Sequence, residues 1–253
     1  MKRAVVVSVV VAVLAAGCGT RRPAEPRASV ATSSTTAGAA ATSSTTTTLE
    51  AVGQAAVSAA PRFHGSVAMI DARTRARMRY SWRPGCPVGL GDLRLLTVDH
   101  WGFDRRVHRG ELVVHRRYAQ AVVRVAGRLF ASRYPVARMR LVDAYQGDDD
   151  RSMAANNTSA FNCRPVAGTR RWSEHAYGGA IDLNPWQNPY VTAGGRVSPP
   201  EGRPYANRAR RALGMVHEGD ATVRAFGSIG WGWGGRWRWR SAKDYQHFSA
   251  SGR

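Results

Sequence analysis

Residues 173–182 read SEHAYGGAID, and they place an imidazole and a carboxylate, His175 and Asp182, on either side of two glycines. Glycine permits tight turns that other residues resist, so the chain can turn after His175 and continue into the short apolar segment 180–183. A turn followed by a strand can bring His175 back over that strand. We therefore expect His175 and Asp182 to meet at one metal ion, with neither residue sufficient alone.

A third donor is present in residues 244–247, DYQH. Two imidazoles and one carboxylate are a common catalytic zinc set that leaves the fourth position to water, so His247 is predicted to complete the site. Hydrolysis at such a site still needs a base that manages protons, and Asp244 is the candidate. Residues three apart on a regular strand face opposite sides. We therefore expect Asp244 in the turn that enters the strand of His247.

The remaining histidines are predicted to be structural or exposed. Taken singly, His175 or His247 would also be read as a hydrogen-bonded structural histidine, and only the joint pattern favours a metal site. His217-Glu218 lacks the second histidine of an H-E-x-x-H helix, because Ala221 stands in that position. The histidines outside the predicted site are His64, His100, His108, His115 and His217.

The pattern of apolar residues predicts a single α+β domain with a small antiparallel sheet and flanking helices. Helical spacing predicts a helix over 116–134. Valine-rich or alternating segments predict strands over 111–115 and 138–144. Asp220 suits the N-cap of a short helix that Gly227 ends. We also expect the two site segments, 180–183 and 245–248, to be strands.

Two other clusters have a structural and a functional interpretation. Tryptophans at alternate positions near the C-terminus fit one face of a strand, where core packing is favoured over a platform for stacking sugars. The three acidic residues 148–150 lack the spacing of a calcium loop, so a solvated turn is favoured over a cation site. The tryptophans are Trp231, Trp233, Trp237 and Trp239.

The N-terminal segment predicts export. A basic start precedes an apolar run over 4–16, which has the length of a signal-peptide core and is too short to span a bilayer. The run ends in LAAGC, residues 14–18, which resembles the bacterial lipobox. Residues 1–17 are therefore predicted to be a lipoprotein signal peptide, and Cys18 the lipid anchor. An ordinary signal with an incidental cysteine is the alternative.

Residues 18–60 are rich in Ser, Thr and Ala and are predicted to form a disordered, lipid-anchored linker before a domain at 61–253. The formal charge of +20 is carried almost entirely by arginine. Such a charge attracts nucleic acid, an anionic membrane face or an acidic polymer. The export signal argues against nucleic acid. We expect a monomeric lipoprotein on the outer face of the cytoplasmic membrane.

Two cysteines remain after Cys18, and an exported protein meets an oxidising compartment. A disulfide between Cys86 and Cys163 is the simplest account. A thiolate nucleophile or metal ligand is the alternative, but neither cysteine has a C-x-x-C partner.

The site motifs resemble those of the zinc D-alanyl-D-alanine carboxypeptidases and the related L-alanyl-D-glutamate endopeptidases. Their signature is S-x-H-x-x-G-x-A-x-D followed by a distal acid-x-x-H. The resemblance extends to 156–164, 184–190 and 230–235 and covers about residue 86 to the end. The residues that match the first motif are Ser173, His175, Gly178, Ala180 and Asp182.

This resemblance implies a hedgehog/DD-peptidase-like zinc fold. It also implies roles for the matching residues: Zn²⁺ bound by His175, Asp182 and His247, Asp244 as general base, and Ser173 in substrate binding. Two departures from the family pattern matter. Many carboxypeptidases of this type have glutamate where this chain has Asp244, whereas aspartate resembles the endopeptidases.

The second departure is the absence of an upstream Tyr-Arg-Ser, where Tyr145-Gln146-Gly147 stands instead. Removal of a terminal D-alanine requires recognition of its free carboxylate, for which a forked guanidinium is best suited. Arg151 and Arg164 are the candidates for this substrate contact. Cleavage inside a stem peptide does not need such an arginine.

Three classes of function follow. The first is a zinc metallopeptidase acting on peptidoglycan stem peptides, as a D-Ala-D-Ala carboxypeptidase or alternatively as an L-Ala-D-Glu endopeptidase. The second is a binding module that keeps the fold and the zinc without hydrolysis, against which the presence of Asp244 argues. The third is a basic lipoprotein that clamps anionic membrane or wall polymer, with zinc serving stability.

Overall fold

A computed structural model describes residues 60–238 and 242–252, which belong to a compact unit spanning Val57–Arg253. The predicted signal peptide, the Cys18 anchor, nearly all of the predicted linker and Trp239 lie outside the described residues. In the part of the chain that is described, no helix is long and apolar enough to cross a membrane.

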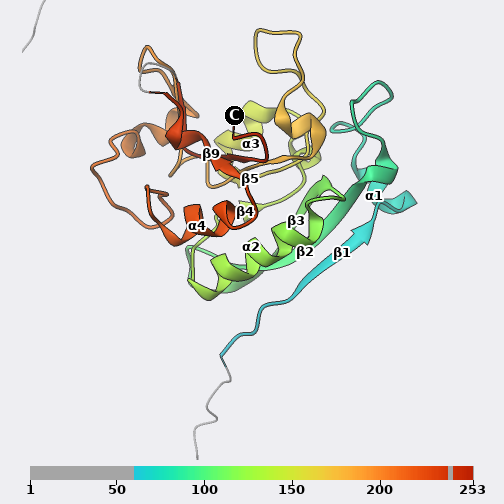
Figure 1. The fold of residues 1–253 in the computed structure, drawn as a ribbon, viewed down its shortest axis with the longest axis horizontal. Helices are drawn as coiled ribbons and strands as arrows, with labels where there is room; N and C mark the ends of the chain where they lie inside the picture. Colours follow the sequence, from blue (N-terminus) through green and yellow to red (C-terminus); the bar gives the residue numbers. More distant parts are fainter. Residues whose placement is uncertain (1–59, 239–241, 253) are drawn as a thin grey trace, which may run out of the picture. The chain divides into compact units, whose positions relative to one another are not determined.

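The largest sheet has three antiparallel strands in the order β1-β2-β3 (Figure 1). They are β1 (Gly65–Met69), β2 (Leu93–Trp101) and β3 (Val107–His115). The pairing of β2 with β3 extends from Leu93 opposite His115 to Trp101 opposite Val107. Successive side chains of a strand point to opposite faces, so this hairpin supplies two different apolar layers.

Helix α2 (Ala119–Ala131) packs on the first face of this sheet, as Figure 1 shows. Its buried residues include Val122, Val125 and Leu129, which contact the strands and confirm an amphipathic helix in this segment. The helix ends three residues earlier than predicted. Arg133 is left-handed with φ of 52°, and the Tyr134 amide donates to the Leu129 carbonyl at 2.9 Å, which closes the last turn.

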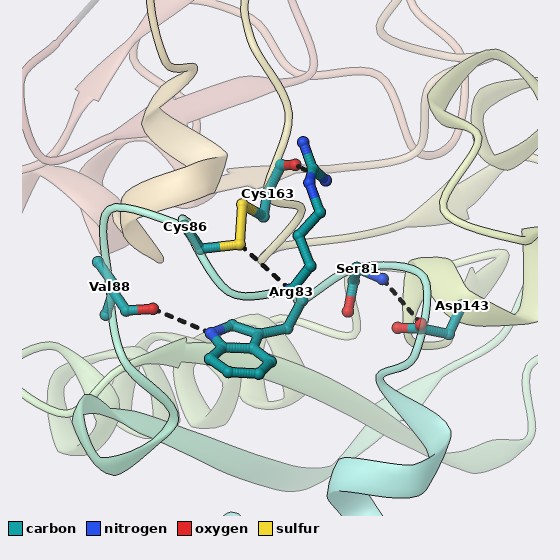
Figure 2. Close-up of a disulfide and its surroundings, with 7 residues drawn as sticks. Ser81, Arg83, Cys86, Val88, Asp143 and Cys163 are labelled. Atoms are coloured by element: carbon teal, nitrogen blue, oxygen red, sulfur yellow. Dashed lines mark hydrogen bonds between the residues drawn. A yellow bond between two sulfur atoms is a disulfide. The ribbon is translucent and has the colours of Figure 1, made fainter.

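The second face of the sheet is covered by the segment that follows helix α1 (Ala72–Arg77). Met78 and Leu141 pack against Val113 of β3 there. A disulfide joins Cys86 in this segment to Cys163, with Cα atoms 5.8 Å apart (Figure 2). The expected disulfide is therefore present, and it ties the covering segment to the loop that leads to the predicted metal site.

Segment 138–144 forms much less strand than predicted. Only β4 (Arg138–Met139) is a strand in this segment, and it pairs in parallel with β5 (Asn157–Thr158), whereas the expected antiparallel pairing is found in the other sheets. The side chain of Asn157 explains where β4 ends, because it accepts from the Arg140 amide at 2.9 Å and donates to the Arg140 carbonyl at 3.0 Å. The chain then turns into a 3₁₀ helix, η2 (Val142–Tyr145).

The C-terminal part of the chain contains two further small sheets. The first has the order β6-β11-β9, and it carries two of the expected site segments. Its strands are β6 (Ala180–Asp182), β11 (His247–Ser249) and β9 (Gly232–Trp233). The second has the order β10-β7-β8, from β10 (Lys243–Asp244), β7 (Tyr190–Val191) and β8 (Val197–Ser198). The remaining short helices are η1 (Leu90–Asp92), α3 (Asp149–Ala154), η3 (Glu174–Tyr177), η4 (Pro200–Tyr205), α4 (Ala221–Gly227) and η5 (Gly234–Arg236).

Three local expectations need correction. Trp231, Trp233 and Trp237 do not share one strand face, because η5 follows β9 directly; Trp231 and Trp233 are nevertheless core residues. Asp148 is not in an isolated turn but caps α3 by accepting from the Arg151 amide at 3.0 Å. Asp220 precedes α4 as expected, yet its carboxylate accepts from the preceding turn instead of from the helix.

Candidate metal centre

The turn of the SEHAYGGAID motif is formed by η3 and the glycine that follows it. Ser173 precedes η3, and its hydroxyl accepts from the His175 amide at 3.3 Å. Gly178 ends η3 with φ of 65°, and a Cβ atom at this position would lie 2.5 Å from the His115 amide nitrogen. Only glycine satisfies both requirements. The backbone therefore reverses here and places His175 beside β6.

Strand register brings the other two residues together. His247 of β11 lies directly opposite Asp182 of β6 in the antiparallel pair. The other side of Asp182 is fixed by Ser159, since the two residues exchange backbone hydrogen bonds of 2.9 and 3.1 Å. All three residues of the expected triad, His175, Asp182 and His247, are buried.

The side chains of this triad converge. His247 Nδ1 is 3.0 Å from Asp182 Oδ1, and His175 Nε2 is 3.1 Å from Asp182 Oδ2. One ligand atom from each residue can be chosen so that all three lie within 4.8 Å of one another. Two ligands of a tetrahedral zinc ion, each about 2.1 Å from the metal, are roughly 3.4 Å apart. The spacing therefore fits a metal ion of this kind.

The hydrogen bonding of His175 supports this fit. Its Nδ1 lies 2.6 Å from the Ala160 carbonyl oxygen, which can only accept, so Nδ1 carries the proton and Nε2 holds a lone pair. Accordingly, Nε2 is buried without a hydrogen-bond partner, even though Asp182 Oδ2 is only 3.1 Å away. Two acceptors facing each other at this distance repel unless a proton or a metal ion lies between them. The chemistry of this donor set therefore favours a bound metal.

The pKa values of the two carboxylates of the centre, Asp182 and Asp244, are shifted in opposite directions. Burial raises the pKa of Asp182, but the neighbouring His175 and His247 lower it more, so the pKa lies well below its usual range. Burial and the charge of Asp182 raise the pKa of Asp244 to about 7, against the opposing influence of the two histidines. Asp182 is therefore a permanent anion, whereas Asp244 can exchange a proton near neutral pH.

Asp244 is not in the turn where we expected it. It lies on β10, where it pairs with Tyr190 of β7, and the chain bends over Tyr245 and Gln246 before β11 begins. The argument from alternating faces fails because Asp244 and His247 belong to different strands. Oδ1 of Asp244 is nevertheless buried without a partner, and the two histidines and Asp182 are close enough to influence its pKa.

Of the two candidate arginines, Arg164 is the one connected to the centre. Its carbonyl oxygen accepts from the Ser173 amide at 3.1 Å, and its guanidinium donates to Asp149 Oδ2 at 2.5 Å. Its Nε atom is buried without a partner. The described contacts of Arg151 are with Gln146 and Asp148, and its side chain is 65% exposed.

Asp149 is a functional candidate that the sequence does not single out. Burial raises its pKa, Asp182 adds to this effect, and Arg164 and His175 oppose it, so Asp149 lies within electrostatic reach of the triad. Its side chain is 22% exposed, so solvent or a ligand can reach part of it. Within an acidic run it resembles any solvated residue, and only the fold reveals that it holds Arg164.

Comparison with known proteins gives one match. The family model described as D-alanyl-D-alanine carboxypeptidase matches residues 167–250, a segment that contains the triad and Asp244 but not Arg164. No curated protein and no solved structure matches the chain. The family resemblance carried by SEHAYGGAID and DYQH is therefore confirmed over residues 167–250, the part of the chain that matches this family model.

Proposed function

We propose that this chain is a zinc metallopeptidase that removes the terminal D-alanine from peptidoglycan stem peptides. The observation that carries the proposal is the buried convergence of His175, Asp182 and His247, with the lone pair of His175 left without a donor. Asp244 lies close enough for the histidines to influence its pKa. A purely structural metal site would not need this fourth residue.

Zinc is the metal that this donor set suits best. Imidazole and carboxylate ligands in a four-coordinate site are typical of Zn²⁺, whereas Ca²⁺ and Mg²⁺ prefer oxygen ligands throughout. The ion would be held by His175, Asp182 and His247. When bound, zinc supplies a Lewis acid that polarises a carbonyl group and lowers the pKa of water to about 7.

Asp244 supplies the proton transfer. With a pKa of about 7 in the metal-free protein, its carboxylate can accept a proton from the attacking water and return it to the nitrogen of the departing D-alanine. The unpartnered Oδ1 is free for this exchange. Among the described residues near the triad, no other acidic side chain has this combination, since Asp182 is held as an anion and Asp149 is paired with Arg164.

Arg164 is proposed to bind the terminal carboxylate of the substrate. One nitrogen of its guanidinium donates to Asp149, and its other donors include the buried Nε, which has no partner. A charge-assisted hydrogen bond from such a group contributes about 1.5–3 kcal/mol. Ser173 already accepts from the His175 amide, so its hydroxyl proton is available to a substrate oxygen.

An L-Ala-D-Glu endopeptidase is the second candidate. The observation that favours it is the identity of residue 244, an aspartate where many carboxypeptidases of this type have glutamate. The proposal also includes a hedgehog/DD-peptidase-like fold for the domain at 61–253. It further includes a location on the outer face of the cytoplasmic membrane, supported by the signal-like residues 1–17, the lipobox cysteine Cys18 and the low-complexity linker.

The test is mass spectrometry of defined stem peptides after incubation with the zinc-loaded full-length chain. Asp244→Ala is the informative variant, and Asp150→Ala, on an exposed residue of α3, is the matched control. Loss of terminal D-alanine with the parent and the control, but not with Asp244→Ala, supports the carboxypeptidase. An internal cut supports the endopeptidase. No cleavage by any of them favours a zinc-containing binding module instead.

A second experiment tests the role of Arg164. Stem peptides with a free and with an amidated C-terminus are compared in the parent and in Asp149→Asn, which weakens the hold on Arg164. We expect KM for the free peptide to rise about tenfold in the variant, with a smaller change in kcat. Equal cleavage of both peptides by the parent would exclude recognition of a terminal carboxylate.

A further inference from the structure

A groove of about 900 Å³ opens on the second face of the β1-β2-β3 sheet. Its floor includes Thr97 and Glu111, which are paired across β2 and β3, and Arg109 two residues earlier on β3. These positions alternate in phase with Val113, which packs under the disulfide-linked segment, so the groove continues the same sheet face beyond that cover. Its walls are α1 and residues 139–144. The triad and Asp244 do not line the groove.

The groove is strongly basic. Five arginines line it against two carboxylates, which leaves a net charge of +3. Within residues 60–238 and 242–252, the guanidinium groups of Arg73 and Arg140 make no described hydrogen bond or ion pair, and both residues are exposed. Arg79 is also exposed, and its only described contact is a cation–π contact with the Tyr80 ring at 4.9 Å. These three residues, Arg73, Arg79 and Arg140, are called the arginine triplet below.

The two carboxylates of the groove are already engaged. Glu111 accepts two hydrogen bonds from Arg77, one of them at 3.0 Å. Asp143 Oδ1 accepts from the backbone amides of Tyr80 and Ser81 at 2.8 and 2.9 Å, and Figure 2 shows the Ser81 contact beside the disulfide. Neither carboxylate makes a described hydrogen bond or ion pair with the arginine triplet, so their two negative charges only reduce the excess of positive charge to the +3 given above.

The two walls that carry the triplet are joined to each other before any ligand arrives. The Asp143 bonds join the turn after α1 to η2, and the Cys86–Cys163 disulfide fixes the next residues of the same segment. Arg83 reinforces this connection by donating to the Cys163 carbonyl at 3.0 Å (Figure 2). A preorganised wall lowers the entropy lost on binding.

We propose that this groove binds a phosphodiester polymer, the chemistry of anionic wall polymers. Every cation in the groove is arginine, whose planar fork matches phosphate geometry better than an ammonium group does. The three guanidiniums of the triplet come from α1, from the turn after it and from segment 139–144, so a polymer lying in the groove would meet charge from two separate parts of the chain. Such a contact would hold the protein on its polymer while a separate site acts on peptides.

The shape of the surface favours a polymer over a membrane. A bilayer presents its phosphates as a plane and contacts residues that protrude, whereas these arginines surround a hollow. Among the groove's apolar side chains, Met139 and Leu141 are each 8% exposed. Tyr80 is 43% exposed, but the Arg79 guanidinium already contacts its ring, so the groove offers little for insertion among lipids. The inference is independent of the peptidase proposal, because it uses none of the residues of the metal centre.

The experiment is a binding titration of the zinc-loaded full-length chain with short poly(glycerol phosphate), beside uncharged polyglycerol. The test variant combines Arg73→Gln, Arg79→Gln and Arg140→Gln. The matched control removes the same charge elsewhere by Arg196→Gln, Arg203→Gln and Arg211→Gln, at exposed positions outside the groove. Thermal unfolding checks that both variants fold as the parent does.

We expect the parent and the control variant to bind poly(glycerol phosphate) with similar affinity, and the test variant to bind at least tenfold more weakly. The affinity of the parent should fall as salt rises. Equal weakening in both variants would mean that net charge alone attracts the polymer and would overturn the proposal. Absence of binding by the parent would also overturn it, as would groove-dependent binding only to phosphatidylglycerol vesicles.

Discussion

Replacing Asp244 by asparagine should stabilise the metal-free protein at neutral and alkaline pH. In the folded chain the pKa of Asp244 rises from its ordinary value of 3.8 to about 7, because the carboxyl is buried and faces the negative charge of Asp182. A group with a raised folded pKa contributes stability below its unfolded pKa, and this contribution is lost as the pH rises toward the folded pKa. The neutral amide of the Asp244→Asn variant does not ionise and so avoids that loss.

The size of the effect follows from the same shift. A change from 3.8 to about 7 corresponds to an upper bound of about 4 kcal/mol once the pH exceeds 7. Although Oδ1 is buried, Asp244 as a whole residue is partly exposed, so water screens part of the repulsion. We therefore expect Asp244→Asn to raise the free energy of unfolding by about 1–3 kcal/mol at pH 8 and by almost nothing at pH 4.

Urea unfolding of the full-length chain in the presence of a chelator, at several pH values between 4 and 8, measures this difference. Comparing the parent with the variant at each pH removes the contribution of the groups that the two proteins share. Asp150→Asn, at an exposed residue of α3, should show no such trend. A stability difference that is flat with pH, or a parent more stable than Asp244→Asn at pH 8, would refute the assigned cause of the shift.

Three further outcomes are expected. His175→Ala should lower zinc affinity at least a hundredfold in equilibrium dialysis, because one of three protein ligands is removed. Gly178→Ala should destabilise the chain by about 2 kcal/mol or more in urea unfolding, because φ is 65° and the new Cβ would meet the His115 amide. Cys86→Ser should lower stability by about 4 kcal/mol, measured against the non-reduced parent, because the disulfide with Cys163 closes a loop across 77 residues.

Much of the metal centre could be predicted because its central motif is local. His175, Gly178 and Asp182 lie within ten residues, and the glycine explains how the first can approach the last. His247 was recognisable by its residue type and its acid-x-x-H spacing. Its position opposite Asp182 depends on strand register, which a three-residue strand with little alternation does not reveal.

The parts that could not be predicted depend on long-range contacts. Strands β1 and β2 supply most of the main sheet, yet β1 is an exposed edge without clear alternation of apolar residues. Segment 138–144 has the alternation of a strand, but the Asn157 side chain takes the hydrogen bonds that would continue β4. Asp149 lies near the triad only because α3 and the Arg164 loop pack together.

The bond between His175 and the Ala160 carbonyl has a consequence for mutational tolerance. Every amino acid carries a main-chain carbonyl, so no substitution at position 160 can delete the acceptor that selects the His175 tautomer. Ala160 is 4% exposed, so larger side chains there should be limited by space and not by chemistry. In a saturation library at this position, metal binding should therefore decrease with increasing side-chain volume, and the serine and glycine variants should retain it. If a side chain set the tautomer instead, every substitution that removed the side chain's acceptor would weaken metal binding.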